Sequence, residues 1–109
     1  MLIALASKDG VSINQHFGHA ERFLIFEVEG DEVRLVAEKQ VERYCSFDPD
    51  HPLRGHILRD IAATLDGCRV IVCAQIGEAP RMELERLGID CFVVEGPIAP
   101  TLIALSKML

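Results

Sequence analysis

The sequence predicts an α/β domain built on a mixed five-stranded sheet, and three observations lead to this expectation. Short apolar runs bounded by turn residues recur along the chain, as buried strands do. In the second half these runs alternate with segments of helical periodicity, which indicates parallel strands joined by helical crossovers. In the first half two apolar runs flank a short reversal, which is typical of an antiparallel hairpin. The expected order is therefore β-β-β-α-β-α-β-α.

The first half contributes three expected strands. Leu2–Ala6 is a short apolar run that ends at the turn residues Ser7–Gly10. Phe23–Val28 and Val33–Val41 are the next two strands. Between them Glu29–Glu32 supplies the glycine and acidic residues of a tight reversal, so these two strands are expected to pair antiparallel.

The second half begins with a helix, because apolar residues recur at helical spacing between Leu53 and Leu65, and Gly67 stands where a C-terminal cap is expected. We expect Met82, Leu84 and Leu87, which belong to the next helix, to lie in the core. The further elements are a strand at Val70–Ala74, a helix at Pro80–Leu87, a strand at Ile89–Val94 and a helix at Pro97–Leu109. The complete order matches the three-layer ribonuclease H-like arrangement.

Length and charge limit the possible functions. The 109 residues, half of them hydrophobic, fit a single domain covering residues 1–109. A net charge of -6 argues against a duplex nucleic-acid partner, which needs clustered Lys and Arg. No apolar run approaches the roughly 18 residues needed to span a bilayer, and the N-terminus lacks the features of a signal peptide. We therefore expect a cytoplasmic protein without a membrane partner.

The cysteines separate into two kinds. Cys68, Cys73 and Cys91 flank or lie within apolar runs, so we expect them in the core as free thiols. Cys45 differs, because it follows Tyr44 and precedes a polar, proline-rich turn. No C-x-x-C spacing is present, and a closed structural zinc site lacks a credible set of four ligands.

The segment Asn14–Ala20 carries two histidines, His16 and His19, three residues apart in a long polar connection after the first strand. Long connections inside small domains are often binding loops, and the embedded Phe17 is expected to anchor this one. Neutral imidazole is a good ligand for transition metals, so a metal ion or metal cluster is the first ligand to consider.

Strand direction is expected to bring these side chains to one edge of the sheet. If the second strand is antiparallel to both the first and the third, then the first and third end at the same edge. His16, His19 and Cys45 follow those ends, and Gln75–Gly77 and Glu95–Gly96 follow the later strands. For His16 a ligand role is favoured over bracing the loop by a bond to a backbone carbonyl, whereas for His19 the two roles remain open.

Two enzymatic interpretations are weaker. A two-metal nuclease needs converging carboxylates, yet the first and fourth strands contain no acidic residue and only Asp60 on the first helix could contribute. A nucleophilic Cys45 with His16 or His19 as its base would need an oxyanion hole and an orienting residue, which no feature of the chain singles out. We therefore expect a protein that is not an enzyme.

The chain resembles the dinitrogenase iron-molybdenum cofactor biosynthesis family, the NifX and NafY type domains that also form the C-terminal part of NifB proteins. The resemblance covers essentially the whole chain and rests on Asn14–Phe23, Glu42–Cys45, Ile76–Gly77 and Leu87–Ile89, with His-Phe-Gly-His as its specific part. It implies a ribonuclease H-like fold without nuclease activity. It also implies binding and carriage of the iron-molybdenum cofactor or its iron-sulfur precursor.

The same resemblance implies ligand and partner roles. His16 is carried over first as the cluster ligand and His19 second, and the presence of Cys45 favours the cofactor role. Independently of the resemblance, Arg22, Arg43 and the lysine at position 8 lie close in sequence to the expected ligands and are candidates to supply positive charge for an anionic cluster, with surface solubility as an equal alternative. The implied partners are nitrogenase cofactor assembly proteins and apo-dinitrogenase. The alternative is a regulatory or protein-interaction domain that binds another metal or only a protein, and either a monomer or a dimer fits the sequence.

Overall fold

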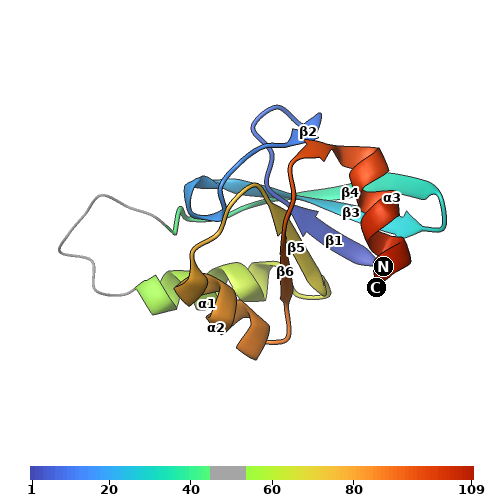
Figure 1. Ribbon diagram of the computed structural model, residues 1–109. Coiled ribbons are helices and arrows are strands. Elements are labelled where there is room, and N and C mark those ends of the chain that lie inside the picture. The colour runs from blue at the N-terminus through green and yellow to red at the C-terminus, as the bar shows by residue number, and fades with distance from the viewer. Residues whose placement is uncertain (45–53) are drawn as a thin grey trace.

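A five-stranded mixed sheet forms the centre of the computed structural model, which describes residues 1–44 and 54–109, with the backbone alone for residues 54–56 (Figure 1). The strands lie in the order β4-β3-β1-β5-β6. Their bounds are β1 Leu2–Leu5, β3 Arg22–Glu29, β4 Glu32–Gln40, β5 Val70–Cys73 and β6 Asp90–Val93. The α/β class and the five-stranded mixed sheet predicted from the sequence are therefore confirmed.

The strand directions decide where the connecting segments meet. Strand β3 is antiparallel to both β1 and β4, whereas β5 is parallel to both β1 and β6. Strands β1, β4, β5 and β6 therefore all run the same way and end at one edge of the sheet, which we call the carboxyl edge. The predicted common edge for the first and third strands of the sequence is thus confirmed.

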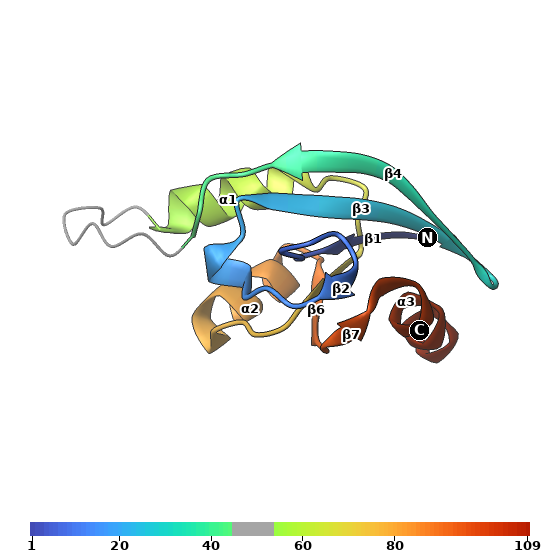
Figure 2. The same cartoon turned by 90° about the horizontal axis from the view of Figure 1, so that it is seen from above.

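Helices cover both faces of the sheet. Helices α1 (Arg54–Thr64) and α2 (Glu78–Arg86) lie apart from α3 (Ile98–Met108) in two views at right angles (Figures 1 and 2). Each face has its own core. One core joins the sheet to buried residues of α1 and α2, and the other joins it to buried residues of α3. This arrangement makes a three-layer domain.

Strand β5 shows how the two cores share the sheet. Ile71 and Cys73 face the α1 and α2 side, while Val70 and Val72 face α3, because successive side chains of a strand point to opposite faces. All four are buried, as expected for a strand covered on both sides.

The structure confirms and corrects other expectations about burial. The predicted burial of Cys68, Cys73 and Cys91 is confirmed. The expectation that Met82 and Leu87 lie in the core is wrong, because Met82 on α2 is 61% exposed and Leu87, directly after α2, is 40% exposed.

Three short elements lie outside the predicted order. Strand β2 (Ser12–Ile13) pairs antiparallel with β7 (Gly96–Pro97) in a separate two-stranded sheet, and a 3-10 helix, η1, covers Phe17–His19. Two- and three-residue elements are too short to produce a periodic pattern, so the sequence could not indicate them. The predicted start of the first helix at Leu53 lies outside the described residues. Within the described ranges, none of the helices combines the length and apolar character required to cross a bilayer.

Candidate functional site

The segment Asn14–Ala20, which we call the histidine segment, is attached to the carboxyl end of β5 by backbone hydrogen bonds. The N–H of Phe17 donates to the carbonyl of Gln75 at 2.8 Å, and the N–H of Ala74 donates to the carbonyl of Gln15 at 2.9 Å. His16 and Gln75 form an isolated parallel bridge between these bonds. The segment therefore extends the sheet beyond β5 and holds His16 at the carboxyl edge.

An aromatic cluster anchors the same segment to the core. Phe17 is 1% exposed, and its ring centroid lies 5.7 Å from that of Phe23 and 6.0 Å from that of Tyr44. The predicted anchor role of Phe17 is confirmed. Since Tyr44 is the last described residue before position 54, the cluster also brings the chain after β4 to the histidine segment.

The imidazole rings of His16 and His19 are exposed and stacked on each other. Their centroids are 5.3 Å apart and their planes differ by 5°. His16 is the N-cap of η1, and its carbonyl accepts the N–H of His19 at 3.1 Å, so a single turn of three residues brings the side chains at i and i+3 above one another. The three-residue spacing of the two histidines therefore places their rings parallel to one another and facing solvent.

This stacking limits how the pair can bind metal. The lone pair of an imidazole nitrogen lies in the plane of its ring, so two stacked rings in separate parallel planes cannot both direct lone pairs at one atom. The described residues include no group of three or more His, Cys, Asp or Glu side chains suited to a metal ion. In the observed rotamers the pair can instead present two parallel donors to two atoms of a larger ligand.

A hollow of about 450 Å³ lies beside His19 at the carboxyl edge. It brings together three of the predicted site residues, His19, Arg22 and Arg43, with the lysine that the sequence also suggested, Lys8. Its other lining residues are Ser7, Gln15 and Glu21. His16 lies outside the lining, stacked on His19.

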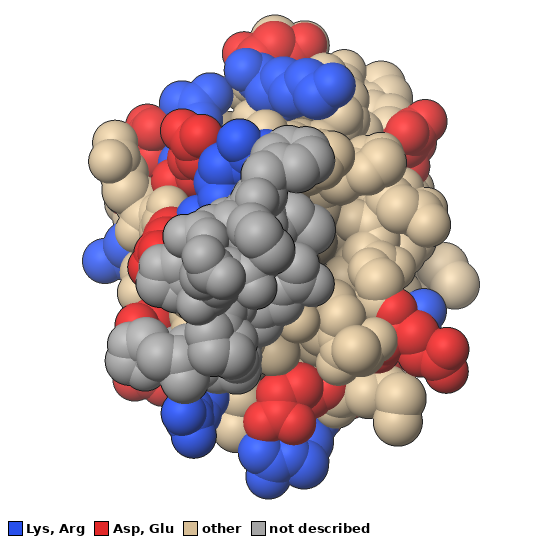
Figure 3. Space-filling view, turned by 90° about the vertical axis from the view of Figure 1, so that its left-hand side faces the viewer, with Lys and Arg blue, Asp and Glu red and all other residues tan. Residues whose placement is uncertain are grey.

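The charges around the hollow are mixed. Arg22 pairs with Glu38 at 3.0 Å, and Arg43 Nε lies 4.0 Å from a carboxylate oxygen of Glu21, which is too long for a hydrogen bond. No ion pair among the described residues involves Lys8. Figure 3 shows this side of the molecule with blue and red side chains next to one another and a broad uncharged area beside them, so the surface is not uniformly basic.

One predicted site residue, Cys45, lies outside the described residues, and so does His51. For His56 the structure describes the backbone of α1 alone.

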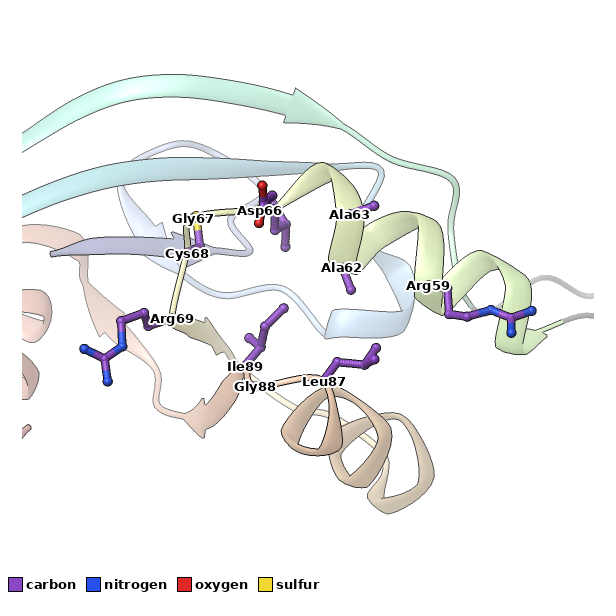
Figure 4. Close-up of a pocket in the computed structure, with 11 residues that line it drawn as sticks. Arg59, Ala62, Ala63, Asp66, Gly67, Cys68, Arg69, Leu87, Gly88 and Ile89 are labelled. Carbon is purple, nitrogen blue, oxygen red and sulfur yellow. The ribbon is translucent and has the colours of Figure 1, made fainter.

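A second hollow, of about 420 Å³, lies at the opposite edge of the sheet, between the C-terminal ends of α1 and α2 (Figure 4). Figure 4 shows Arg59 and Arg69 at its two ends, pointing away from one another, with Leu87 and Ile89 between them. Cys68 also lines it, and burial raises the pKa of this thiol, with a further contribution from a neighbouring aspartate. A protonated, buried thiol is a poor metal ligand, so this hollow is the weaker candidate.

A polar network that the sequence pattern did not indicate lies next to the first hollow. Ser7, Asp9 and Asn14 are joined by side-chain hydrogen bonds directly upstream of the histidines. The signal that could have found it is the concentration of short polar side chains around Gly10, since such residues bind nearby backbone groups in turns.

Comparison with known proteins adds a family match to this geometry. Residues 1–108 match the family described as dinitrogenase iron-molybdenum cofactor. The FeMo cofactor biosynthesis protein NifB of Sinorhizobium fredii is 38% identical over 89 residues, which cover 80% of this chain and 17% of that protein. NifB of Azotobacter vinelandii is 36% identical over 90 residues, covering 83% of this chain and 18% of that protein. The chain thus spans less than a fifth of the length of these curated relatives.

Solved structures show the same fold at low sequence identity. The crystal structure of PH0822 aligns with a TM-score of 0.67 and 22% identity, covering 99% of this chain and 90% of that one. A structure from Methanocaldococcus jannaschii aligns with a TM-score of 0.60 and 18% identity, covering 99% of this chain and 88% of that one. At these identities the likeness concerns the fold alone.

Proposed function

Because the chain belongs to the dinitrogenase iron-molybdenum cofactor family, we propose that it binds the iron-molybdenum cofactor or its iron-sulfur precursor as cargo and passes it on without catalysing a reaction. The relatives named NifB are FeMo cofactor biosynthesis proteins, and this chain corresponds to a part of them. We also assign the domain to the ribonuclease H-like fold, which the strand order β4-β3-β1-β5-β6 supports.

The observation that carries the proposal is the exposed, parallel pair of imidazoles, of which His19 lines a hollow. A single ion could not use both lone pairs in this arrangement, whereas a cluster presents several metal atoms on one face. His16 would be the first ligand, and His19 either a second ligand or the ring that supports it. Imidazole suits both iron and molybdenum, which fits the proposed cargo.

Cys45 would complement the imidazoles, since thiolates are the usual ligands of iron in clusters. Cys45 lies outside the described residues. The contact between Tyr44 and Phe17 supports its involvement, because Tyr44 directly precedes Cys45 and Phe17 lies between the two histidines.

Positive charge for an anionic cargo would come from Lys8, Arg22 and Arg43, which line the hollow. Arg22 and Arg43 face Glu38 and Glu21 in exposed ion pairs. Such pairs contribute only about 0–1 kcal/mol each, so a cluster could displace the carboxylates at little cost. The arginines would then bind the cargo in exchange for their present partners.

Few protein ligands suit a carrier, because each additional metal bond slows release. We propose that the cargo comes from nitrogenase cofactor assembly proteins and goes to apo-dinitrogenase, in the cytoplasm. The chain would protect the cluster between these two steps.

Anaerobic titration with isolated iron-molybdenum cofactor, followed by its visible absorption, tests the proposal. We expect His16→Ala and Cys45→Ala each to weaken binding by about tenfold or more, which corresponds to at least about 1.4 kcal/mol. Binding should also weaken as the pH falls from 8 to 5, because neutral imidazole and thiolate are the ligating forms. The matched variant Arg69→Ala, which removes a charge at the opposite hollow, should bind like the wild type.

Unchanged affinity in the double variant His16→Ala/Cys45→Ala, with an unchanged circular dichroism spectrum, would refute the carrier function. Binding of a single ion such as Co²⁺ in place of the cluster, with a similar loss in these variants, would favour the alternative of a regulatory domain that binds another metal. Because the His16 side chain is exposed, its replacement by alanine leaves the core intact, and the circular dichroism spectrum checks this.

A further inference from the structure

The carboxylate of Asp9 is the centre of a hydrogen-bond network in the loop that connects β1 to the histidine segment. Its Oδ1 accepts the N–H of Val11 at 2.9 Å, the N–H of Ser12 at 3.1 Å and the hydroxyl of Ser7 at 3.2 Å. Its Oδ2 accepts the side-chain amide of Asn14 at 3.3 Å. Four donors therefore converge on one exposed side chain.

Both the nitrogen and the oxygen of the Asn14 side-chain amide form hydrogen bonds. Its Nδ2 donates to Asp9, and its Oδ1 accepts the backbone N–H of Lys8 at 2.8 Å. This fixes the orientation of the amide, because a rotation that exchanged its oxygen and nitrogen would break both bonds. The chain at residue 8 is thus tied to the chain at residue 14 through one side chain.

These two points of the chain lie at, or directly next to, residues that line the hollow beside His19. Ser7 and Lys8 line it from the chain before Asp9, which we call the first wall, and Gln15 and His19 line it from the chain after Asn14, which we call the second wall. Gln15 follows Asn14 directly, and its side-chain amide donates to the carbonyl of His19 at 3.4 Å. The network therefore sets the distance between the two walls from outside the hollow, since neither Asp9 nor Asn14 lines it.

We propose that Asp9 and Asn14 are positioning residues, which act as a matched acceptor and donor pair to hold Lys8 in place relative to His19 and so shape the hollow. They would act on the ligand only through the walls, without touching it. The part of this proposal that concerns cargo affinity rests on the proposed function, whereas the part that concerns the loop does not.

The ionised form of Asp9 is the form that the network requires. The hydrogen bond from Val11, followed by that from Ser12, lowers the pKa of this carboxyl group below its ordinary value, so all four acceptor contacts are available at neutral pH.

An exchange of the two side chains tests the pairing. Asp9→Asn puts two amide NH₂ groups face to face unless Asn14 turns and gives up Lys8, and Asn14→Asp puts two carboxylates together. In the double variant Asp9→Asn/Asn14→Asp, the amide at position 9 can donate to the carboxylate at position 14. That carboxylate can also accept the N–H of Lys8, so the full network is available again with the same net charge.

Hydrogen exchange measured by NMR on the backbone amides of Lys8, Val11 and Ser12 reads the loop without any ligand. We expect exchange of the Lys8 amide to be about tenfold faster in each single variant, which is the effect of losing about one charge-assisted hydrogen bond, and to return toward the wild-type rate in the double variant. A double variant no better protected than Asp9→Asn would overturn the proposal.

Affinity for isolated iron-molybdenum cofactor supplies the second measurement. Affinity should fall about tenfold in each single variant and recover in the double variant, while the circular dichroism spectrum of the folded chain stays unchanged. The control Asp31→Asn removes the same charge from an exposed turn residue paired with Lys107, far from the hollow, and should leave affinity unchanged. Rescue of exchange without any cofactor binding in the wild type would refute the carrier function and support the positioning role.

Discussion

Replacement of Phe17 by leucine tests whether the histidine segment is built on the core. Phe17 is 1% exposed and makes tilted ring contacts with Phe23 and Tyr44 at 5.7 and 6.0 Å. Each such pair contributes about 0.5–1.5 kcal/mol beyond burial, so losing both should lower the free energy of unfolding by roughly 1–3 kcal/mol. In a domain of this size that corresponds to a fall in Tm of about 8 °C at the middle of the range.

Urea unfolding followed by circular dichroism measures this loss, with Phe26→Leu as the matched control. Phe26 is 9% exposed in the core on the α3 side, and the ring contacts among the described residues do not include it. The control should therefore lose less stability than Phe17→Leu. A loss below about 0.5 kcal/mol for Phe17→Leu, or one equal to that of Phe26→Leu, would refute the reasoning that ring pairs anchor the segment.

Three further outcomes are expected. The hydrogen bond from Val11 lowers the pKa of Asp9 from its ordinary 3.8, so its contribution to stability is present above about pH 4 and is lost as the pH falls through the lowered value. Urea midpoints of Asp9→Asn should therefore fall less steeply below pH 4 than those of the wild type, and parallel curves would contradict this. Burial raises the pKa of Cys73 to about 11 and that of Cys91 to about 12, so iodoacetamide at pH 8 should label neither thiol until urea unfolds the chain, as peptide mass spectrometry would show. Gly96→Ala should lower the free energy of unfolding by about 1–3 kcal/mol, because the φ angle of Gly96 is +147° and the new Cβ would lie 3.1 Å from a threonine hydroxyl of α3. An unchanged urea midpoint would contradict this strain.

The central sheet could be predicted because its strands are long enough to show a pattern. Strand β5 is a run of four buried apolar residues, and the periodicity before Leu65 fixed the helix that precedes it. Strand direction then followed from the crossovers and the hairpin, and this placed His16 and Gln75 at one edge without any contact information.

The expected burial of Met82 and Leu87 was wrong because helical periodicity predicts which face of a helix is apolar but not how much of that face reaches the core. Leu84 is fully buried, while Met82 on the same helix and Leu87 directly after it are exposed. The helix covers an edge of the sheet next to α1, so only a narrow stripe of it reaches the core.

The candidate site was predicted by residue type but not by geometry. The i, i+3 spacing of His16 and His19 indicated a ligand-binding loop, yet the stacking of their rings depends on a three-residue 3-10 helix that no pattern reveals. The hydrogen bonds of Asp9 were missed for a similar reason, because they join residues across a turn whose local conformation decides which donors point inward.

The histidine segment combines a stabilising residue and two exposed ones within a single turn. His16 caps the 3-10 turn and bonds to His19 across it, and each residue of such a turn lies about 120° from the last, so a buried Phe17 leaves the two histidines together on another side of the turn. One extra residue between the histidines would rotate His19 by about 120° relative to His16 and separate the rings while Phe17 stayed in the core. The ring pair is therefore a consequence of spacing and of one buried anchor, which is why it can face solvent without cost to the core that holds it.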